Sequence, residues 1–225
     1  MSAGRKRSTT LLAIDTATTR VVVAAGDTAG RWIESTDWPA GYRHGETLLA
    51  TIESFLARLH LERDRLAAIV VGTGPGAFTG LRVGIATAKG LAHGLGRPIV
   101  GISTASALLA AAPARAVLLL PAGPADRIVV RDGGPASLLP AGLEPEIDSD
   151  ETLVAVDLAD RAPVAALALG EAARGSLGAS LIALARVRFA TGDVDDLARL
   201  VPEYVTLPRG VRSEDGEVSW SRDRR

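Results

Sequence analysis

A glycine-rich segment between a short apolar run and an amphipathic stretch is the part of this sequence best suited to chemistry. It is GTGPGAFTGLR, from Gly72 to Arg82. Backbone N–H groups in such a loop, with the N-terminus of the following helix, bind phosphate and other anions. The same glycines equally suit a tight turn between a strand and a helix, because glycine adopts positive φ angles without strain. The candidate anion-binding residues are Gly74, Gly76 and Thr79, and Thr79 is also a candidate helix cap.

A second candidate loop closes the first apolar run, where Asp15 and Thr16 precede Ala17-Thr18-Thr19. A carboxylate with neighbouring hydroxyl groups can meet a phosphate through a metal ion. The alternative is a plain hairpin, in which Asp and Thr side chains bond to the local backbone. The sequence contains no Walker A motif, since Lys89 lies too far into the predicted helix. Two candidate phosphate loops are therefore present without an established nucleotide-binding motif.

Cysteine and histidine chemistry has little support. The chain has no Cys, which excludes disulfides, thiolate nucleophiles, iron–sulfur clusters and zinc fingers. Its three histidines are His44, His60 and His93, and none forms an H-E-x-x-H or H-x-x-x-H pair. His44 stands before a predicted helix, where a solvated or capping role is the common one. We predict no metal site.

Composition narrows the class of protein further. The 225 residues carry 25 Lys and Arg against 26 Asp and Glu, so no overall basic excess favours binding to a nucleic-acid backbone. No apolar run approaches the ~18 residues of a membrane span. Asp15 interrupts the first apolar run too early for a signal peptide, so we expect a cytoplasmic protein. With 24 Gly and only 4% aromatic residues, either the core is thin or backbones pack closely.

The hydrophobic pattern predicts an α/β order along the chain. Three strands at residues 10–14, 20–25 and 31–36 form a meander, followed by a helix at 46–61 and a buried strand at 68–72. A helix to residue 95, a strand at 99–102 and a helix to 112, capped by Ser103 or Thr104, come next. After that we predict strands at 117–120, 128–131 and 153–156, a loop at 133–145, and helices at 165–173, 181–187 and 193–200.

The helix after the glycine-rich loop carries small residues every four positions: Gly80, Gly84, Ala88, Ala92 and Gly96. Glycine inside a helix costs about 1 kcal/mol relative to Ala, so a stripe of this kind needs a compensating contact. Close approach of another helix backbone is one explanation. The other is that the stripe faces the chain's own sheet.

These motifs resemble a known family. The segment from Gly72 to Thr104 closely resembles the TsaB family, also called YeaZ, with Ala77 where the family commonly has Ser. The N-terminal LLAIDTATT and the HGETLL segment that begins at His44 resemble two further family motifs. The match covers roughly residues 10–110, and the sequence departs from the family pattern at 121–128.

The resemblance implies an actin-like ATPase fold with two ribonuclease-H-like lobes, each a mixed sheet flanked by helices. We expect an N-terminal lobe at residues 9–108, a smaller C-terminal lobe at 109–211, and flexible termini at 1–8 and 212–225. It also implies a non-catalytic subunit that binds TsaD, and TsaE with it, for transfer of threonylcarbamoyl to N6 of adenosine 37 in ANN-decoding tRNAs. In that case this chain contacts tRNA only indirectly, through the complex.

The resemblance further implies that the first two helices contact TsaD. The expected interface is Leu48, Leu49, Ile52, Phe55, Leu56, Gly80, Gly84, Thr87, Ala88, Leu91 and Ala92. We expect no cofactor of its own, a candidate ATP or ADP site at the TsaD junction, and homodimers when the partner is absent. The alternative is a kinase or ATPase of actin-like fold that uses the Asp15 and Gly74–Gly80 loops.

Overall fold

The structure, a computed structural model, describes residues 9–29, 31–40 and 44–205. The N-terminal lobe is built on a five-stranded mixed sheet in the order β3-β2-β1-β4-β5. The strands are β1 (Thr10–Asp15), β2 (Arg20–Asp27), β3 (Trp32–Pro39), β4 (Leu66–Gly72) and β5 (Ile99–Ile102). Strands β1 to β3 form the predicted antiparallel meander, while β4 pairs in parallel with both β1 and β5.

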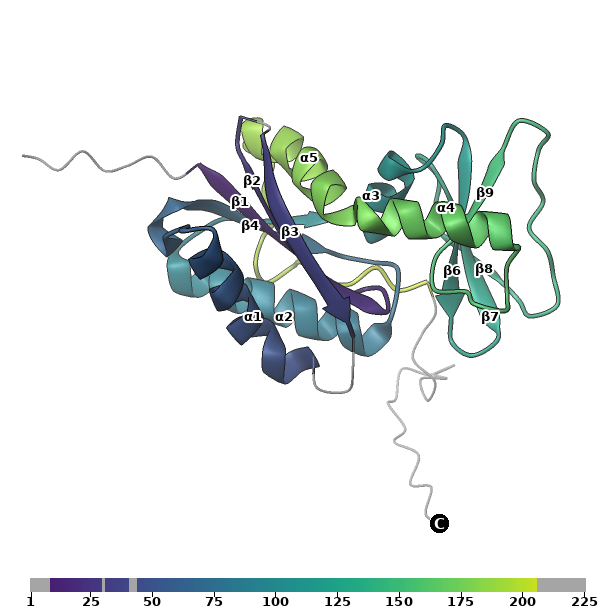
Figure 1. The fold of residues 1–225 in the computed structure, drawn as a ribbon, viewed down its shortest axis with the longest axis horizontal. Coiled ribbons are helices and arrows are strands. Elements are labelled where there is room, and N and C mark those ends of the chain that lie inside the picture. The colour runs from purple at the N-terminus through teal and green to yellow at the C-terminus, as the bar shows by residue number, and fades with distance from the viewer. Residues whose placement is uncertain (1–8, 30, 41–43, 206–225) are drawn as a thin grey trace, which may run out of the picture.

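Helices cover both faces of this sheet (Figure 1). Helices α1 (His44–Arg58) and α2 (Phe78–Leu95) lie on one face, and α5 (Leu177–Ala190) lies on the other. Strand β1 is buried at all six positions, because Leu12 and Ile14 pack toward α1 and α2 while Leu11 and Ala13 pack toward α5. Its uninterrupted apolar sequence is what a strand covered on both faces requires.

The second lobe holds a four-stranded sheet in the order β8-β7-β6-β9. Its elements are β6 (Ala116–Ala122), β7 (Asp126–Arg131), β8 (Ser137–Leu139), β9 (Thr152–Ala155) and α4 (Val164–Gly175). Strand β8 lies inside the predicted loop at 133–145, so that prediction was wrong at three residues. A three-residue edge strand is too short to show the alternation that identifies a strand.

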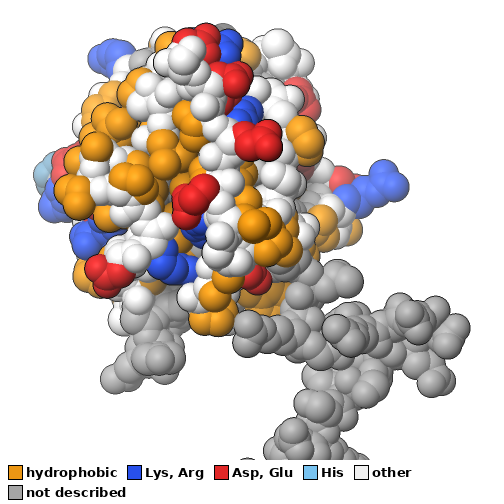
Figure 2. Space-filling view, turned by 90° about the vertical axis from the view of Figure 1, so that its right-hand side faces the viewer, with side chains coloured by type: hydrophobic (Ala, Val, Ile, Leu, Met, Phe, Trp, Pro, Cys, Tyr) orange, Lys and Arg blue, Asp and Glu red, His pale blue; other side chains and the backbone are white. Residues whose placement is uncertain are grey.

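Figure 2 views the molecule from the side of this lobe and shows hydrophobic side chains at the surface among charged ones. The large exposed apolar residues of the lobe are Leu138, Leu143, Ile147 and Val164.

Helix α3 (Thr104–Ala111) begins directly after β5 and lies where the two lobes meet (Figure 1). Ser103, one of the two predicted caps, caps it by accepting a hydrogen bond from Ser106 N–H at 3.4 Å, whereas Thr104 is already inside the helix. One apolar cluster joins α3, α5 and both sheets through side chains such as Leu108, Leu118 and Leu181. The two lobes therefore share a continuous core. The short η1 (Arg63–Arg65) precedes β4.

The chain returns to the first sheet after the second lobe. Helix α5 packs on β1, β2, β4 and β5, and the segment after it runs along the outer edge of β5. The predicted helix at 193–200 is wrong: Asp195 instead forms a bridge with Ile99, and its N–H donates to Ile99 O at 2.9 Å. Residues 177–205 thus lie against the first sheet although they fall in the range expected for the second lobe.

In the described part of the chain, no single helix is long and apolar enough to cross a membrane. Only α4 and α5 taken together have the length and apolar composition of a membrane span, and they are bent by 56° at their junction. Their apolar side chains Leu177 and Leu181 are fully buried in the core. The expected flexible termini at 1–8 and 212–225 lie outside the described residues.

Candidate functional site

Asp15 lies at the carboxyl end of β1, fully buried. One carboxylate oxygen accepts a hydrogen bond from Thr104 Oγ1 at 2.6 Å, and the other accepts one from Ala17 N–H at 2.8 Å. Burial nevertheless raises the pKa of Asp15 from 3.8 to about 6, and the nearby charge of Asp157 contributes to that rise. Asp15 is therefore an internal carboxylate that ties β1 to the start of α3.

The two candidate phosphate loops are bonded directly to each other. Ala77 N–H donates to Ala17 O at 2.8 Å, and Thr16 Oγ1 donates to Gly80 O at 2.7 Å. A Cβ added at Gly76 would lie 2.2 Å from Ala17 O, so only glycine allows this approach. The glycines in this loop thus permit one backbone to lie against another.

Further N–H groups of the loop are also occupied. Gly74 has a φ of +102°, and its N–H donates to Thr104 Oγ1 at 3.1 Å. Thr73 N–H donates to Ile102 O at 2.9 Å. These bonds favour the tight-turn interpretation of the sequence over a loop that is open to a phosphate. Phosphate binding by Asp15, Thr16, Gly74 and Gly76 stays a prediction, and these four residues do lie together.

Thr79 does not cap α2, contrary to the sequence-based expectation. The helix begins at Phe78, and its N-cap residue is Ala77, which makes no side-chain capping hydrogen bond. Thr79 is already inside the helix and is exposed. Because the helix already begins at Phe78, Thr79 lies inside its first turn and cannot cap it.

The small-residue stripe of α2 faces the chain's own sheet. Gly80, Gly84, Ala88 and Ala92 are all buried, and a Cβ at Gly80 would lie 2.1 Å from Thr16 O. The expectation that these four residues meet a partner helix is corrected here, because this chain already covers them. The stripe allows α2 to approach the loop after β1.

The outward side of α1 and α2 is different. Leu48, Ile52, Phe55 and Leu56 are buried in the core, whereas Leu49 is 54% exposed. A groove of about 230 Å³ separates the two helices. It is lined by Leu12, Leu49, Ile52, Glu53, Leu56, Arg63, Leu66, Leu91 and Leu95. Among the expected interface residues, Leu49 is thus the most accessible, with Thr87 and Leu91 half-buried beside it.

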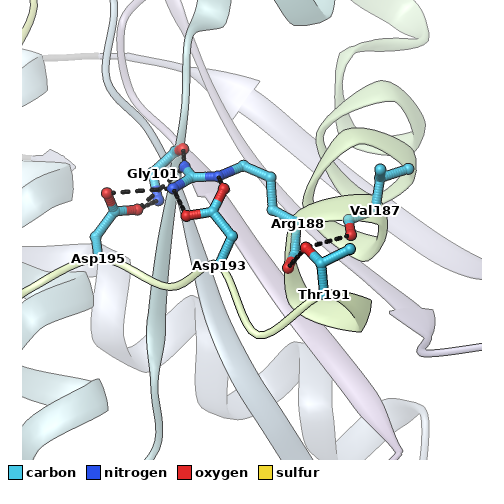
Figure 3. A network of polar contacts seen from close by, with 6 residues as sticks. All are labelled: Gly101, Val187, Arg188, Thr191, Asp193 and Asp195. Atoms are coloured by element: carbon cyan, nitrogen blue, oxygen red, sulfur yellow. Dashed lines mark hydrogen bonds and ion pairs between the residues drawn. The ribbon is translucent and has the colours of Figure 1, made fainter.

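A polar site that the sequence did not reveal lies at the carboxyl end of β4 and β5. We call residues 193–205 the C-terminal strap. Arg188, from α5, holds its start by pairing with Asp193 and Asp195 and by donating to Gly101 O at 2.6 Å (Figure 3). Asp195 in turn accepts Gly101 N–H at 2.7 Å. Side chains thereby occupy both polar backbone groups of Gly101 on the outer strand of the sheet.

The far end of the strap is anchored beside the glycine-rich loop. Glu203 N–H donates to Thr73 O at 2.8 Å, and Thr73 Oγ1 donates back to the Glu203 carboxylate. The centroid of the Tyr204 ring lies 5.2 Å from that of Phe78. The Arg82 guanidinium lies over the Phe78 ring, 3.9 Å from its centroid, and Arg82 Nε–H donates to the Tyr204 hydroxyl at 3.1 Å. Beneath the strap is a polar cavity of about 360 Å³ bordered by Ser103 and Arg199.

Metal ligation has no candidate in the part of the chain that the structure describes, where no three His, Asp or Glu residues gather in a suitable arrangement. The side chain of His44 lies outside the described residues, so its expected capping role stays a prediction. The chemistry available at the buried loops is hydrogen bonding to backbone groups and the protonation of Asp15.

Two α/β lobes, with mixed sheets that share a core at α3 and α5, define an actin-like two-lobe fold. The solved structure of YeaZ from Pseudomonas aeruginosa has this fold. It matches with a TM-score of 0.68 and 25% identity, over 87% of this chain and 99% of that one. The family model described as TsaD, tRNA N6-adenosine threonylcarbamoyltransferase, matches residues 39–156. The chain belongs to this family and, within it, to the TsaB (YeaZ) proteins.

Curated relatives carry the TsaB name. The tRNA threonylcarbamoyladenosine biosynthesis protein TsaB of Haemophilus influenzae is 41% identical over 69 residues, which are 31% of this chain and 29% of that protein. The protein of the same name from Escherichia coli is 35% identical over 96 residues, or 42% of this chain and 40% of that one. The chain spans half or less of the length of the curated relatives it matches.

Proposed function

We propose that this chain is a non-catalytic scaffold subunit in the biosynthesis of threonylcarbamoyladenosine in tRNA. In this proposal it binds TsaD, and TsaE with it, and acts in the cytoplasm. The names of its TsaB relatives and its match to the TsaD family model support a role beside that enzyme. The direct bonds between the Asp15 and Gly76 loops support a role other than turnover of a nucleotide, because those loops are filled by their own contacts.

The observation that carries the proposal is the open apolar face of α1 and α2. Leu49 projects there at 54% exposure beside a groove whose walls include Leu91 and Leu95. A helix of the partner that buries these leucines would gain roughly 25 cal/mol for each Å² of apolar surface removed from water. We therefore assign the contact with TsaD to this outward face and not to the buried stripe of α2.

The test is co-purification of the Leu49→Asp variant with TsaD from the same organism. A carboxylate buried without a partner is strongly unfavourable, so we expect the affinity to fall at least about tenfold. The matched control is Leu138→Asp, which changes a leucine of 44% exposure in the second lobe. Undiminished binding of a folded Leu49→Asp variant would contradict the assignment.

A second measurement addresses the function directly. TsaD, TsaE and threonylcarbamoyl-AMP are combined with tRNA, with and without this chain, and threonylcarbamoyladenosine is quantified. We expect product to depend on the chain and to be lost with Leu49→Asp. Equal product without the chain argues against the scaffold role. ATP turnover by the isolated chain would instead favour the kinase or ATPase alternative.

Two related expectations belong to the same proposal. A nucleotide at the junction with TsaD would be held by the assembled pair and not by this chain's loops, which bond to each other. The open face beside Leu49 would also bring two copies together when TsaD is absent. Sedimentation of the isolated chain and of the Leu49→Asp variant measures their oligomeric state and so tests this self-association.

A further inference from the structure

The loop that joins β1 to β2 reaches across to the second lobe at Thr19. Thr19 N–H donates to one oxygen of Asp157 at 2.6 Å, and Thr19 Oγ1 donates to the other at 2.5 Å. The two residues are 138 positions apart in the sequence. Hydrogen bonds to an ionised carboxylate are shorter and stronger than those between neutral groups. Both hydrogen-bond donors of Thr19 and both carboxylate oxygens of Asp157 are thus engaged in one contact between the lobes.

The backbone at Asp157 is unusual in a way that serves this contact. Asp157 follows β9 by two residues and has a φ of +58°, in the left-handed region that residues other than glycine rarely adopt. Such conformations persist where surrounding contacts hold them, and they gather at functional positions. Here the two bonds from Thr19 are the contacts that hold the Asp157 side chain.

The first-lobe side of the contact is rigidly held. The loop from Asp15 to Thr19 is fixed by the bonds of Asp15 to Thr104 and of Thr16 to Gly80. Thr19 O also accepts Ala40 N–H at 2.7 Å. The Thr19–Asp157 contact consequently ties the N-terminal lobe, to which the Thr19 loop is fixed, to the end of β9.

The apolar packing of α3 and α5 also connects the lobes, through side chains such as Leu108 and Leu181. That packing is buried, whereas Thr19 is exposed and Asp157 is half-buried at the rim. The rim contact can therefore break without exposing the shared core. Beneath the rim lies Asp15, which is fully buried and close enough to feel the charge of Asp157.

We propose that Thr19 and Asp157 form a latch that sets the angle between the two lobes. Closed, the latch holds the end of β9 over the loop that begins at Asp15. Open, it lets the second lobe turn away about the apolar packing of α3 and α5. This proposal concerns the isolated chain and does not depend on the scaffold function.

The test uses Asp157→Gly, which removes the carboxylate and leaves a residue that adopts positive φ without strain. Asp160→Gly is the matched control, since Asp160 lies in the same segment at a φ of +63° and is exposed. Asp157→Asn serves as the conservative variant, because an amide can accept from Thr19 N–H and donate to Thr19 Oγ1.

The chain contains no Cys, so two introduced cysteines can be spin-labelled without background. Exposed Ala57 on α1 and exposed Ala168 on α4 are suitable positions, one in each lobe. We expect Asp157→Gly to lengthen and broaden the distance distribution between the labels, with both other variants matching the parent chain. Amide exchange at Thr19 should rise at least about tenfold in Asp157→Gly alone. An unchanged distance and unchanged Thr19 exchange in Asp157→Gly, or the same shift in Asp160→Gly, would overturn the latch.

Discussion

Gly84 of α2 lies directly against Thr16: a Cβ added at Gly84 would stand 2.1 Å from Thr16 Oγ1. The same hydroxyl donates to Gly80 O, one helical turn earlier on α2. Gly80 and Gly84, on the same side of α2, thus both lie against Thr16 from the loop after β1. The absence of side chains there allows a polar contact between elements that are 64 residues apart.

Gly84→Ala should destabilise the isolated chain by about 2 kcal/mol. Overpacking of a closed contact costs about 1–3 kcal/mol, and displacing the Thr16 hydroxyl from Gly80 O adds about 1. The better helix propensity of Ala returns about 1 kcal/mol of this. Urea unfolding of the purified chain, followed by circular dichroism, measures the difference.

Gly90→Ala is the matched control on the same helix, because a Cβ there meets no atom within 4 Å. Helix propensity alone predicts that this change stabilises the chain by about 0.5–1 kcal/mol. Opposite signs at the two positions are therefore expected. A stabilising effect at Gly84 would show that the stripe is not packed against its own sheet.

Asp15→Asn should change how stability depends on pH. The pKa of Asp15 in the folded chain, about 6, lies above its ordinary value of 3.8, so the folded state holds this proton more tightly. The stabilisation is fully present below pH 3.8 and is lost as the pH rises through 6. A pKa difference of this size corresponds to about 3 kcal/mol.

Because Asn stays neutral, the stability of Asp15→Asn relative to the parent chain should improve by up to ~3 kcal/mol between pH 4 and pH 7. Asp27→Asn provides the opposite trend. Hydrogen bonds from Arg31 lower the pKa of Asp27, so its stabilising contribution appears as the pH rises. Unfolding free energies between pH 4 and pH 7 test the Asp15 slope, and those below pH 4 test the Asp27 slope, because the lowered pKa of Asp27 lies below 3.8. Parallel curves for Asp15→Asn and the parent chain would mean that burial does not raise the pKa of Asp15.

Arg188→Met should loosen the start of the C-terminal strap. The change leaves Gly101 O without its guanidinium donor and leaves Asp193 and Asp195 without their shared cation. The side chain of Arg188 is 30% exposed, so we expect a loss of about 1–3 kcal/mol, less than for a fully buried pair. Amide exchange at Gly101, whose N–H donates to Asp195, should rise with it.

Arg186→Met is the control for this prediction. Arg186 is two residues earlier on the same helix and lies outside the network drawn in Figure 3. Its replacement should alter unfolding free energy by less than about 0.5 kcal/mol, as is usual for surface positions. Equal effects of the two substitutions would remove any special role of Arg188 in holding the strap.

The sequence determined the element order of the first lobe and the motifs that assign the chain to its family. Strands β1, β4 and β5 are short, mostly apolar runs, and α1 shows one apolar side at helical spacing. These are local patterns, set by residues within a few positions of one another, so they can be recognised in a single sequence. The composition, rich in glycine and poor in aromatic residues, left open a thin core or close packing, and close packing occurs where Gly76 and Gly84 meet the loop after β1.

Tertiary structure alone decided which surface those small residues face. Periodicity places Gly80, Gly84 and Ala88 on one side of α2 but does not say whether that side meets a partner or the chain's own sheet. The bonds from Arg188 to Gly101 and from Thr19 to Asp157 were equally hidden, since they join residues 87 and 138 positions apart. Contacts of that kind depend on the path of the whole backbone. For this chain, sequence spacing therefore fixed the elements, and only folding in three dimensions decided what they touch.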